Sequence, residues 1–165
     1  MLIFRRVAAY SIDIVILFSI LAPTSLLLNW LFGTPQDGLA IWRAAVLSFS
    51  LPAWTYFVLS DWSRRGATLG KRLLNIAVTD MAGQRVSLTR AFVRTAIKLL
   101  PWELTHMVFV FAIGAQQFTI PQQTLLIIAN LLLVIYLAVV ILTRGRRSIH
   151  DVLVGTTVGS RQTST

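Results

Sequence analysis

An aspartate stands inside the first apolar run of the chain, shortly after a pair of arginines. The run begins with the segment Arg5-Arg6-Val7-Ala8-Ala9-Tyr10-Ser11-Ile12-Asp13. Asp13 follows Arg6 by seven residues, nearly two helical turns, so a helix would place both side chains on one face. A carboxylate in hydrocarbon costs at least about 2.5 kcal/mol, and Asp13 therefore needs a partner or a water-filled pocket.

Two interpretations of Arg6 and Asp13 stay open. In the first, Asp13 is a proton or cation site within a helix bundle, and Arg6 tunes its acidity. In the second, Asp13 forms a structural ion pair or a hydrogen bond to a neighbouring side chain or helix. Because Arg6 marks the cytoplasmic mouth of the helix, we expect a vestibule on that side, where Asp13 and Arg6 meet His150 and Asp151 of the tail.

Other polar residues interrupt the later apolar runs. Glu103 and His106 are three residues apart and share a helix face. Glu-x-x-His occurs in di-metal helix bundles, but those bundles need a second copy and further glutamates, and one copy is present here. We therefore expect no metal site and no cofactor. The sequence predicts that Glu103 and His106 either line a cavity facing Asp13 or form a hydrogen bond within their helix. Asn130 and Tyr136 are expected to contribute to the same interior.

A glycine-containing segment, Gly66 to Lys71, superficially resembles a phosphate-binding loop. It lacks the four-residue glycine spacing, and its lysine is followed by Arg72 instead of serine or threonine. We expect a tight turn in which Lys71 and Arg72, with Arg64 and Arg65, contact anionic lipid phosphates or a cytoplasmic partner.

The segment Ser148-Ile149-His150-Asp151 has the spacing of a helix capping box. It predicts a helix that starts after the basic tail residues. Asp151 is also a candidate partner for a cytoplasmic arginine.

The composition indicates an integral membrane protein. Of 165 residues, 56% are hydrophobic and 13% are charged, whereas soluble domains are about a quarter charged. The net charge of +9 comes from basic residues that flank apolar runs. This placement indicates that they mark the cytoplasmic side of the membrane and disfavours nucleic-acid binding. The chain has no cysteine, and no nucleophile–base pair or set of paired carboxylates indicates an enzyme.

Four apolar runs predict an all-α membrane protein, a four-span transmembrane helix bundle. The spans are expected over residues 7–32, 44–60, 96–115 and 124–143. The third run is the weakest candidate for a membrane span because it contains charged residues. The distribution of basic residues around it nevertheless predicts that it crosses the membrane.

Four crossings place the amino end, a basic loop over 61–95 and a basic tail over 144–165 on one side of the membrane. When the polar connection is counted from Asp61 to Lys98, that side holds 14 of the 15 basic residues, and Arg43 alone lies outside. The positive-inside rule therefore predicts that both termini are cytoplasmic. We expect the membrane to be a bacterial plasma membrane. Within the basic loop, β-prone segments at 76–79 and 85–88 flank a glycine-bearing turn and predict a short cytoplasmic β-hairpin.

Three motifs together resemble the RDD family of small membrane proteins, which is named for an arginine and two aspartates. The first is Arg5-Arg6-x-x-Ala9-x-x-x-Asp13. The second runs from Ala67 to Leu74 and continues through Val78-x-Asp80-x-x-Gly83 to Arg94. The third is Arg146-Arg147-x-x-His150-Asp151-x-x-x-Gly155-Thr156-x-Val158.

The resemblance implies one domain over residues 1–165. Arg6 and Asp13 would be the family's arginine and first aspartate, and Asp151, or else Asp80, the second. It also implies transport of small ligands or monovalent cations, including cation/proton exchange. Because four spans are few for alternating access, a homo-oligomer would be expected. The alternative is a non-transporting scaffold or accessory subunit that binds anionic lipid or a cytoplasmic partner.

Overall fold

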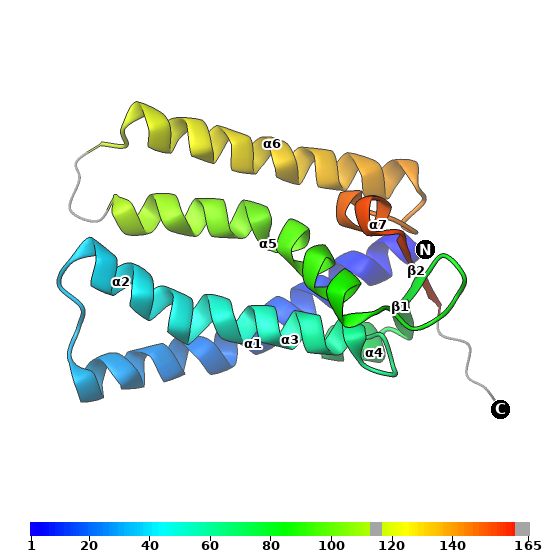
Figure 1. Ribbon diagram of the computed structural model, residues 1–165, viewed down its shortest axis with the longest axis horizontal. Coiled ribbons are helices and arrows are strands. Elements are labelled where there is room, and N and C mark those ends of the chain that lie inside the picture. The colour runs from blue at the N-terminus through cyan, green and yellow to red at the C-terminus, as the bar shows by residue number, and fades with distance from the viewer. Residues whose placement is uncertain (113–116, 161–165) are drawn as a thin grey trace.

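Four long helical segments run side by side through the computed structural model, which describes residues 1–112 and 117–160 (Figure 1). These segments are α1 (Leu2–Phe32), a composite of α2 (Gly38–Ala45), η1 (Val46–Ser50) and α3 (Leu51–Trp62), then α5 (Leu88–Phe111) and α6 (Ile120–Leu142). The short helices α4 (Leu69–Leu73) and α7 (Ile149–Val154) gather with the N-terminus at one end. We call this end of the bundle the charged end, because it carries the ion pairs described below.

The surface of the bundle is apolar over most of its length. Two helices, α1 and α6, are long and apolar enough to cross a membrane. In α6 the large residues Ile127, Leu131 and Val134 are exposed and Ala129 is buried. Such a surface is typical of helices that face hydrocarbon. The two other predicted spans overlap with α2–η1–α3 and with α5, both of which begin earlier than predicted. Positions 113–115 of the third predicted span lie outside the described residues.

Two prolines lie within these helices, with different consequences. Pro23 leaves α1 unbroken to Phe32. Pro52 follows η1, a π-helical segment in which the Leu51 N–H donates to the Val46 carbonyl five residues back. Proline has no N–H and crowds the carbonyl four residues earlier, so a locally wider turn accommodates it. The composite helix thereby stays continuous from Gly38 to Trp62.

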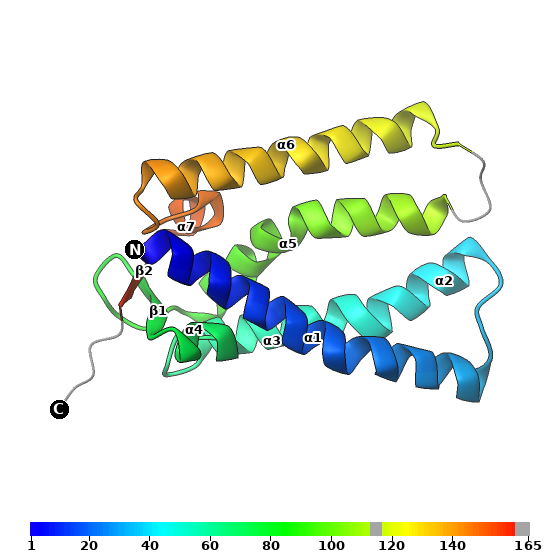
Figure 2. The same cartoon turned by 180° about the vertical axis from the view of Figure 1, so that it is seen from behind.

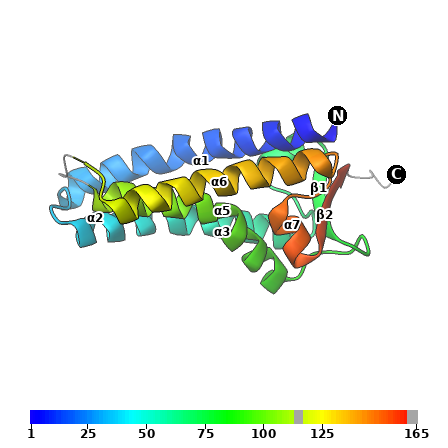
Figure 3. The same ribbon diagram turned by 90° about the horizontal axis from the view of Figure 1, so that it is seen from above.

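A two-stranded antiparallel sheet closes the charged end. Strand β1 (Ile76–Asp80) pairs with β2 (Thr156–Ser160), and Val78 lies opposite Val158 (Figure 3). The first strand of the predicted hairpin is present as β1. The predicted second strand at 85–88 is wrong, because β2 from the tail pairs with β1 instead.

The physical reason lies in the residues that follow β1. The Asp80 carboxylate accepts the N–H groups of Ala82 and Gln84, at 2.9 and 2.7 Å, which forms the expected turn. Beyond the turn, Ser87 becomes the N-cap of α5, and its side chain accepts from the Arg90 N–H. The chain thus enters a helix instead of a second strand, and Val86 packs in the core beside the sheet.

Two apolar clusters support the bundle. One lies beneath the sheet and comprises Ala9, Val58, Ile76, Val78, Val86, Ala91 and Val158. The other fills the space between α1, α3 and α5 and comprises Leu17, Leu21, Ala53, Phe57 and Leu99. The first cluster joins α1 to both strands, so it holds the charged end against the long helices.

Candidate functional site

Asp13 is buried and is satisfied by neutral donors. The residue is 1% exposed. One carboxylate oxygen accepts from the Tyr56 hydroxyl at 2.6 Å and from the Gly70 N–H at 2.8 Å, and the other accepts from the Thr68 hydroxyl at 2.6 Å. Three donors therefore stabilise the negative charge without a cation.

This arrangement binds α4 to α1. Thr68 is the N-cap of α4, and Gly70 lies in the first turn of that helix, where backbone N–H groups lack partners within the helix. The Leu69 N–H donates to the Tyr56 hydroxyl at 2.9 Å. A Cβ atom on Gly70 would lie 2.1 Å from the Ala9 carbonyl oxygen, so the backbones of α1 and α4 approach as closely as glycine permits. Asp13 thus caps α4 across the contact between α1 and α4. The two helices lie side by side in Figure 2.

Arg6 has a different partner from the expected one. Its guanidinium lies 2.7 Å from the Asp151 carboxylate and donates to the Gly145 carbonyl at 3.1 Å. The prediction that Arg6 pairs with Asp13 is therefore wrong. The two residues do share a helix face, but the tail supplies a carboxylate at the mouth of α1, while α4 supplies the donors for Asp13.

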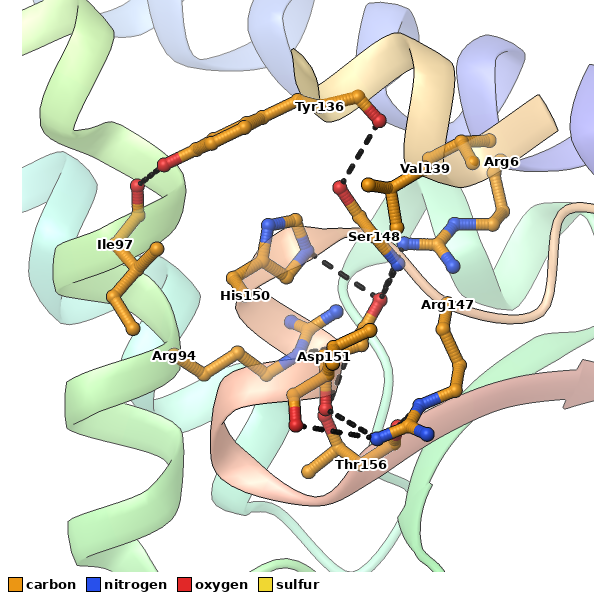
Figure 4. A network of polar contacts seen from close by, with 12 residues as sticks. Arg6, Arg94, Ile97, Tyr136, Val139, Arg147, Ser148, His150, Asp151 and Thr156 are labelled. Carbon is orange, nitrogen blue, oxygen red and sulfur yellow. Dashed lines mark hydrogen bonds and ion pairs between the residues drawn. The ribbon is translucent and has the colours of Figure 1, made fainter. Parts of the chain in front are cut away.

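Arg94 lies at the centre of a buried chain of charges. Its residue is 1% exposed, and its guanidinium bridges two carboxylates, with Nη1 on Asp61 and Nε 2.9 Å from Asp151. Lys71 lies 2.6 Å from Asp61 on one side, and Arg6 pairs with Asp151 on the other. Positive and negative groups alternate along this network, which we call the ionic chain. It joins α4, α3, α5, α7 and α1 in space, as Figure 4 shows around Asp151.

The capping box expected at Ser148 is present and also fixes Asp151. Ser148 is the N-cap of α7, and its N–H donates to Asp151 at 2.9 Å. The Thr156 hydroxyl donates to the other carboxylate oxygen at 2.9 Å. Burial alone would raise the pKa of Asp151, but the positive charges of Arg94 and Arg6 hold that pKa well below its usual range. Asp151 is therefore a permanent carboxylate at neutral pH.

His150 lies beside the ionic chain as a neutral imidazole. Burial, and after it the positive charge of Arg94, lowers its pKa well below the ordinary value. Its ring lies 5.9 Å from the Tyr136 ring, and its Nδ1 has no hydrogen-bond partner among the described residues. A protonated His150 would add a positive charge beside Arg94 and Arg6, so the folded protein resists its protonation.

This burial predicts a pH-dependent stability. Below about pH 6.5 His150 binds a proton in the unfolded chain but not in the folded chain. The free energy of unfolding therefore falls as the pH falls, by up to about 1.4 kcal/mol per pH unit. Thermal unfolding of the detergent-solubilised protein between pH 7.5 and 5.5 measures this slope. His150→Gln should flatten it, and an unchanged slope in the variant would contradict the assignment.

A cavity of about 250 Å³ adjoins the ionic chain, between α1, α5, α6 and α7. Its polar wall carries Arg6, Asp13, Arg94, Lys98 and His150, and its apolar wall includes Val7, Leu133, Leu137 and Val140. Of the residues expected in a shared vestibule, Arg6, Asp13 and His150 thus line one cavity. Asp151 lies behind them as the partner of Arg6 and Arg94.

Lys98 is half-buried and differs from the cations of the ionic chain. Its ammonium lies 3.1 Å from the centroid of the Phe57 ring, a cation–π contact, and no carboxylate of the described residues is within 4.0 Å. Lys71, Arg94 and Arg6 all have carboxylate partners. Four cationic side chains therefore face three carboxylates around the cavity, and one positive charge is in excess.

The predicted interior residues Glu103, His106 and Asn130 do not face Asp13. Glu103 points to α3 and the η1 end, where it accepts from Ser50 and Trp54. The His106 ring packs 4.4 Å from the Trp102 ring. The exposed Asn130 donates to the Leu126 carbonyl of its own helix. The predicted shared lining is wrong because α5 turns Glu103 and His106 toward η1 and α3, and Asn130 lies on the exposed surface of α6.

The residues expected to contact lipid phosphate divide into two groups. Arg64 and Arg65 are exposed and remain free for such contacts. Lys71 is held by Asp61, and Arg72 donates to the Ala67 carbonyl at 3.0 Å. The expectation that Lys71 meets lipid is therefore corrected, because a buried carboxylate lies closer.

Sequence reasoning did not select Asp61, Arg94 or Lys98 as site residues. Asp61 directly follows an apolar run, and Arg94 shares the helix face of Ala91 and Thr95, which are both fully buried. A charged residue on a buried face is a signal that could have identified Arg94. Its partner could not be inferred, because Asp61 and Asp151 are far from it in sequence. Asp80, the alternative second aspartate, holds a turn and lies 3.8 Å from Arg90.

An apolar bundle surface with a buried ionic cluster at one end defines a small integral membrane protein. The sequence model of the RDD family matches residues 2–155, and the chain belongs to this family. No curated protein and no solved structure matched the chain. Within the described ranges, no group of three histidine, cysteine or acidic side chains could hold a metal ion.

Proposed function

We propose that the protein binds the anionic group of a small ligand or lipid headgroup in the cavity beside the ionic chain. The observation that carries this proposal is the Lys98 ammonium, which faces the cavity without a carboxylate partner in the described structure. An unpaired ammonium away from water is costly. Its contact with Phe57 offsets about 2 kcal/mol of this cost. A bound carboxylate or phosphate would supply the missing negative charge.

The walls of the cavity support an amphipathic ligand. Lys98 and Arg6 form part of the polar wall, whereas Leu133, Leu137 and Val140 come from α6, a helix with an exposed apolar surface. A ligand with a charged group at Lys98 and an apolar portion against α6 would satisfy both walls. Anionic lipid meets this description, and so does a small organic acid.

We further propose that the four long helical segments are four membrane spans with the charged end in the cytoplasm. The support is the positive-inside rule, because the amino end, the connection from Asp61 to Lys98 and the tail hold 14 of the 15 basic residues. The bound anion would then lie near the inner leaflet, where anionic lipids attract basic groups. Binding of this kind is the first step for a transporter of small ligands and equally for a membrane scaffold.

Cation/proton exchange at Asp13 remains a prediction, and the geometry favours another role for this residue. A titrating carboxylate needs room for a proton or cation at its oxygens. The oxygens of Asp13 already accept from Tyr56, Thr68 and Gly70. Asp13 therefore serves the docking of α4, and the proposed ligand site lies at Lys98.

The proposal predicts a stabilisation by anions that depends on Lys98. Phosphatidylglycerol should raise the thermal unfolding temperature of the purified protein by several degrees, and phosphatidylcholine should not. Lys98→Gln should abolish this rise while leaving the ligand-free protein at least as stable, because the substitution removes a half-buried charge that has no carboxylate partner among the described residues. Inorganic phosphate and acetate, added separately, distinguish a free anion from a lipid headgroup.

Arg90→Gln is the matched control for Lys98→Gln. Arg90 is on the same helix, and its side chain is 51% exposed. The control should keep the stabilisation by phosphatidylglycerol. Equal loss in both variants would show that lipid binds through general surface charge, and the cavity would not be the site.

A further inference from the structure

A second cavity lies on the other face of α5 and has the opposite charge. Its volume is about 520 Å³, within the usual range of small-molecule sites. It follows the contact of η1 and α3 with α5, from Val46 to Leu59. Its lining is apolar apart from Ser50, Thr55, the Trp54 indole N–H and one carboxylate, that of Glu103.

Glu103 has neutral partners and no described cation. One of its carboxylate oxygens accepts from the Trp54 indole N–H at 2.9 Å, and the other accepts from the Ser50 hydroxyl at 3.0 Å. No lysine, arginine or histidine of the described residues lies within 4.0 Å of the carboxylate. Glu103 is near the middle of the third proposed span, where a carboxylate without a cation is costly.

Aromatic rings stand beside this carboxylate. Trp54 and Phe92 both line the cavity, and their ring centroids are 5.6 Å apart. Aromatic faces attract organic cations, and this attraction strengthens when water is excluded. Leu51, Leu59 and Phe92 are at least half exposed, so the cavity is open on its lipid-facing side to a ligand dissolved in the membrane.

We infer that this cavity binds an organic cation with an apolar body, such as an ammonium compound. Glu103 supplies the opposite charge, and the faces of Trp54 and Phe92 supply cation–π contacts. The apolar side chains of η1 and α3 cover the remainder of the ligand. The π-helical turn at η1 supports the same location, because it sets Ser50 toward Glu103, and such turns occur frequently at functional sites.

This site is independent of the anion site at Lys98. The residues that line the two cavities differ, and the cavities lie on different sides of α5. Failure of one proposal therefore leaves the other standing.

Benzyltrimethylammonium is a suitable probe, because its charge does not change with pH. Calorimetric titration of the full-length protein in detergent should show saturable binding. Glu103→Gln should weaken this binding at least tenfold, because glutamine keeps the side-chain shape but removes the negative charge. Phe92→Leu should weaken it several-fold while leaving both hydrogen bonds to Glu103 in place.

Three comparisons decide the outcome. Neopentylbenzene, the neutral carbon analogue of the probe, should stabilise the protein much less in thermal unfolding. Asp37→Asn changes an exposed helix cap and should bind the probe as the unmodified protein does. Equal binding of the probe to Glu103→Gln would overturn the proposal. Equal stabilisation by the neutral analogue would also overturn it. A Glu103→Gln protein that changes its oligomeric state but binds the probe as before would do the same, because the cavity would then be an interface between copies of the chain.

Discussion

Arg94→Gln is expected to destabilise the protein by about 3–5 kcal/mol, enough to prevent recovery of a folded, monodisperse sample. The guanidinium of Arg94 pairs with two carboxylates that are entirely buried, those of Asp61 and Asp151. Glutamine would leave both buried negative charges short of a cation. Purification yield in mild detergent, followed by thermal unfolding of any folded fraction, measures the effect.

Two further variants at this helix sharpen the result. Arg90→Gln removes an exposed cation four residues earlier and should change stability by less than about 1 kcal/mol. Arg94→Lys should restore only part of the loss, because an ammonium cannot reach two carboxylates with the planar fork of a guanidinium. Wild-type stability of Arg94→Gln would show that the ionic chain does not hold the charged end together.

Asp13→Asn is expected to destabilise the protein by about 1–3 kcal/mol. One carboxylate oxygen accepts from Tyr56 and the Gly70 N–H, and the other accepts from Thr68. In asparagine one of these oxygens becomes an NH2 group, which cannot accept a hydrogen bond from the donors that face it. The contact between α1 and α4 should therefore loosen. Faster protease cleavage within residues 64–75, together with a lower unfolding temperature, would report this loosening.

Asp37→Asn is the control for that substitution. Asp37 is an exposed N-cap that accepts from the Ala40 N–H, and asparagine caps helices equally well. Its stability should stay unchanged. If Asp13→Asn kept full stability but abolished cation-driven proton flux in liposomes, Asp13 would be the titrating group of an exchanger and not a docking residue.

Local patterns predicted the parts of the fold that depend on local physics. Apolar run length placed the long helices, and the Ser148–Asp151 spacing placed a capping box that is present. The family resemblance, based on three separated motifs, is confirmed by the match over residues 2–155. The apolar positions of α6 could face lipid without any knowledge of their neighbours, so no tertiary information was needed.

The meeting of Arg6 with Asp151 of the tail was predicted and is present, but most individual pairings across the chain could not be predicted in the same way. Arg6 and Asp13 share a helix face, yet each finds a partner on a segment that folds back from elsewhere, α7 for Arg6 and α4 for Asp13. Strand β1 likewise pairs with the tail instead of the nearest β-prone segment. Sequence spacing constrains which side chains point in one direction, whereas the choice among several oppositely charged partners depends on the complete packing of the charged end.

The central claim is that an anionic group binds at Lys98, and native mass spectrometry of the protein released from detergent tests it most directly. Equimolar phosphatidylglycerol and phosphatidylcholine are offered together, and the lipid retained on the protein is identified. We expect one phosphatidylglycerol on the unmodified protein and on Arg90→Gln, and at least tenfold less on Lys98→Gln. If inorganic phosphate or acetate displaces the lipid, the bound group is the anion itself. Equal retention by Lys98→Gln, or equal retention of the two lipids, would contradict the account.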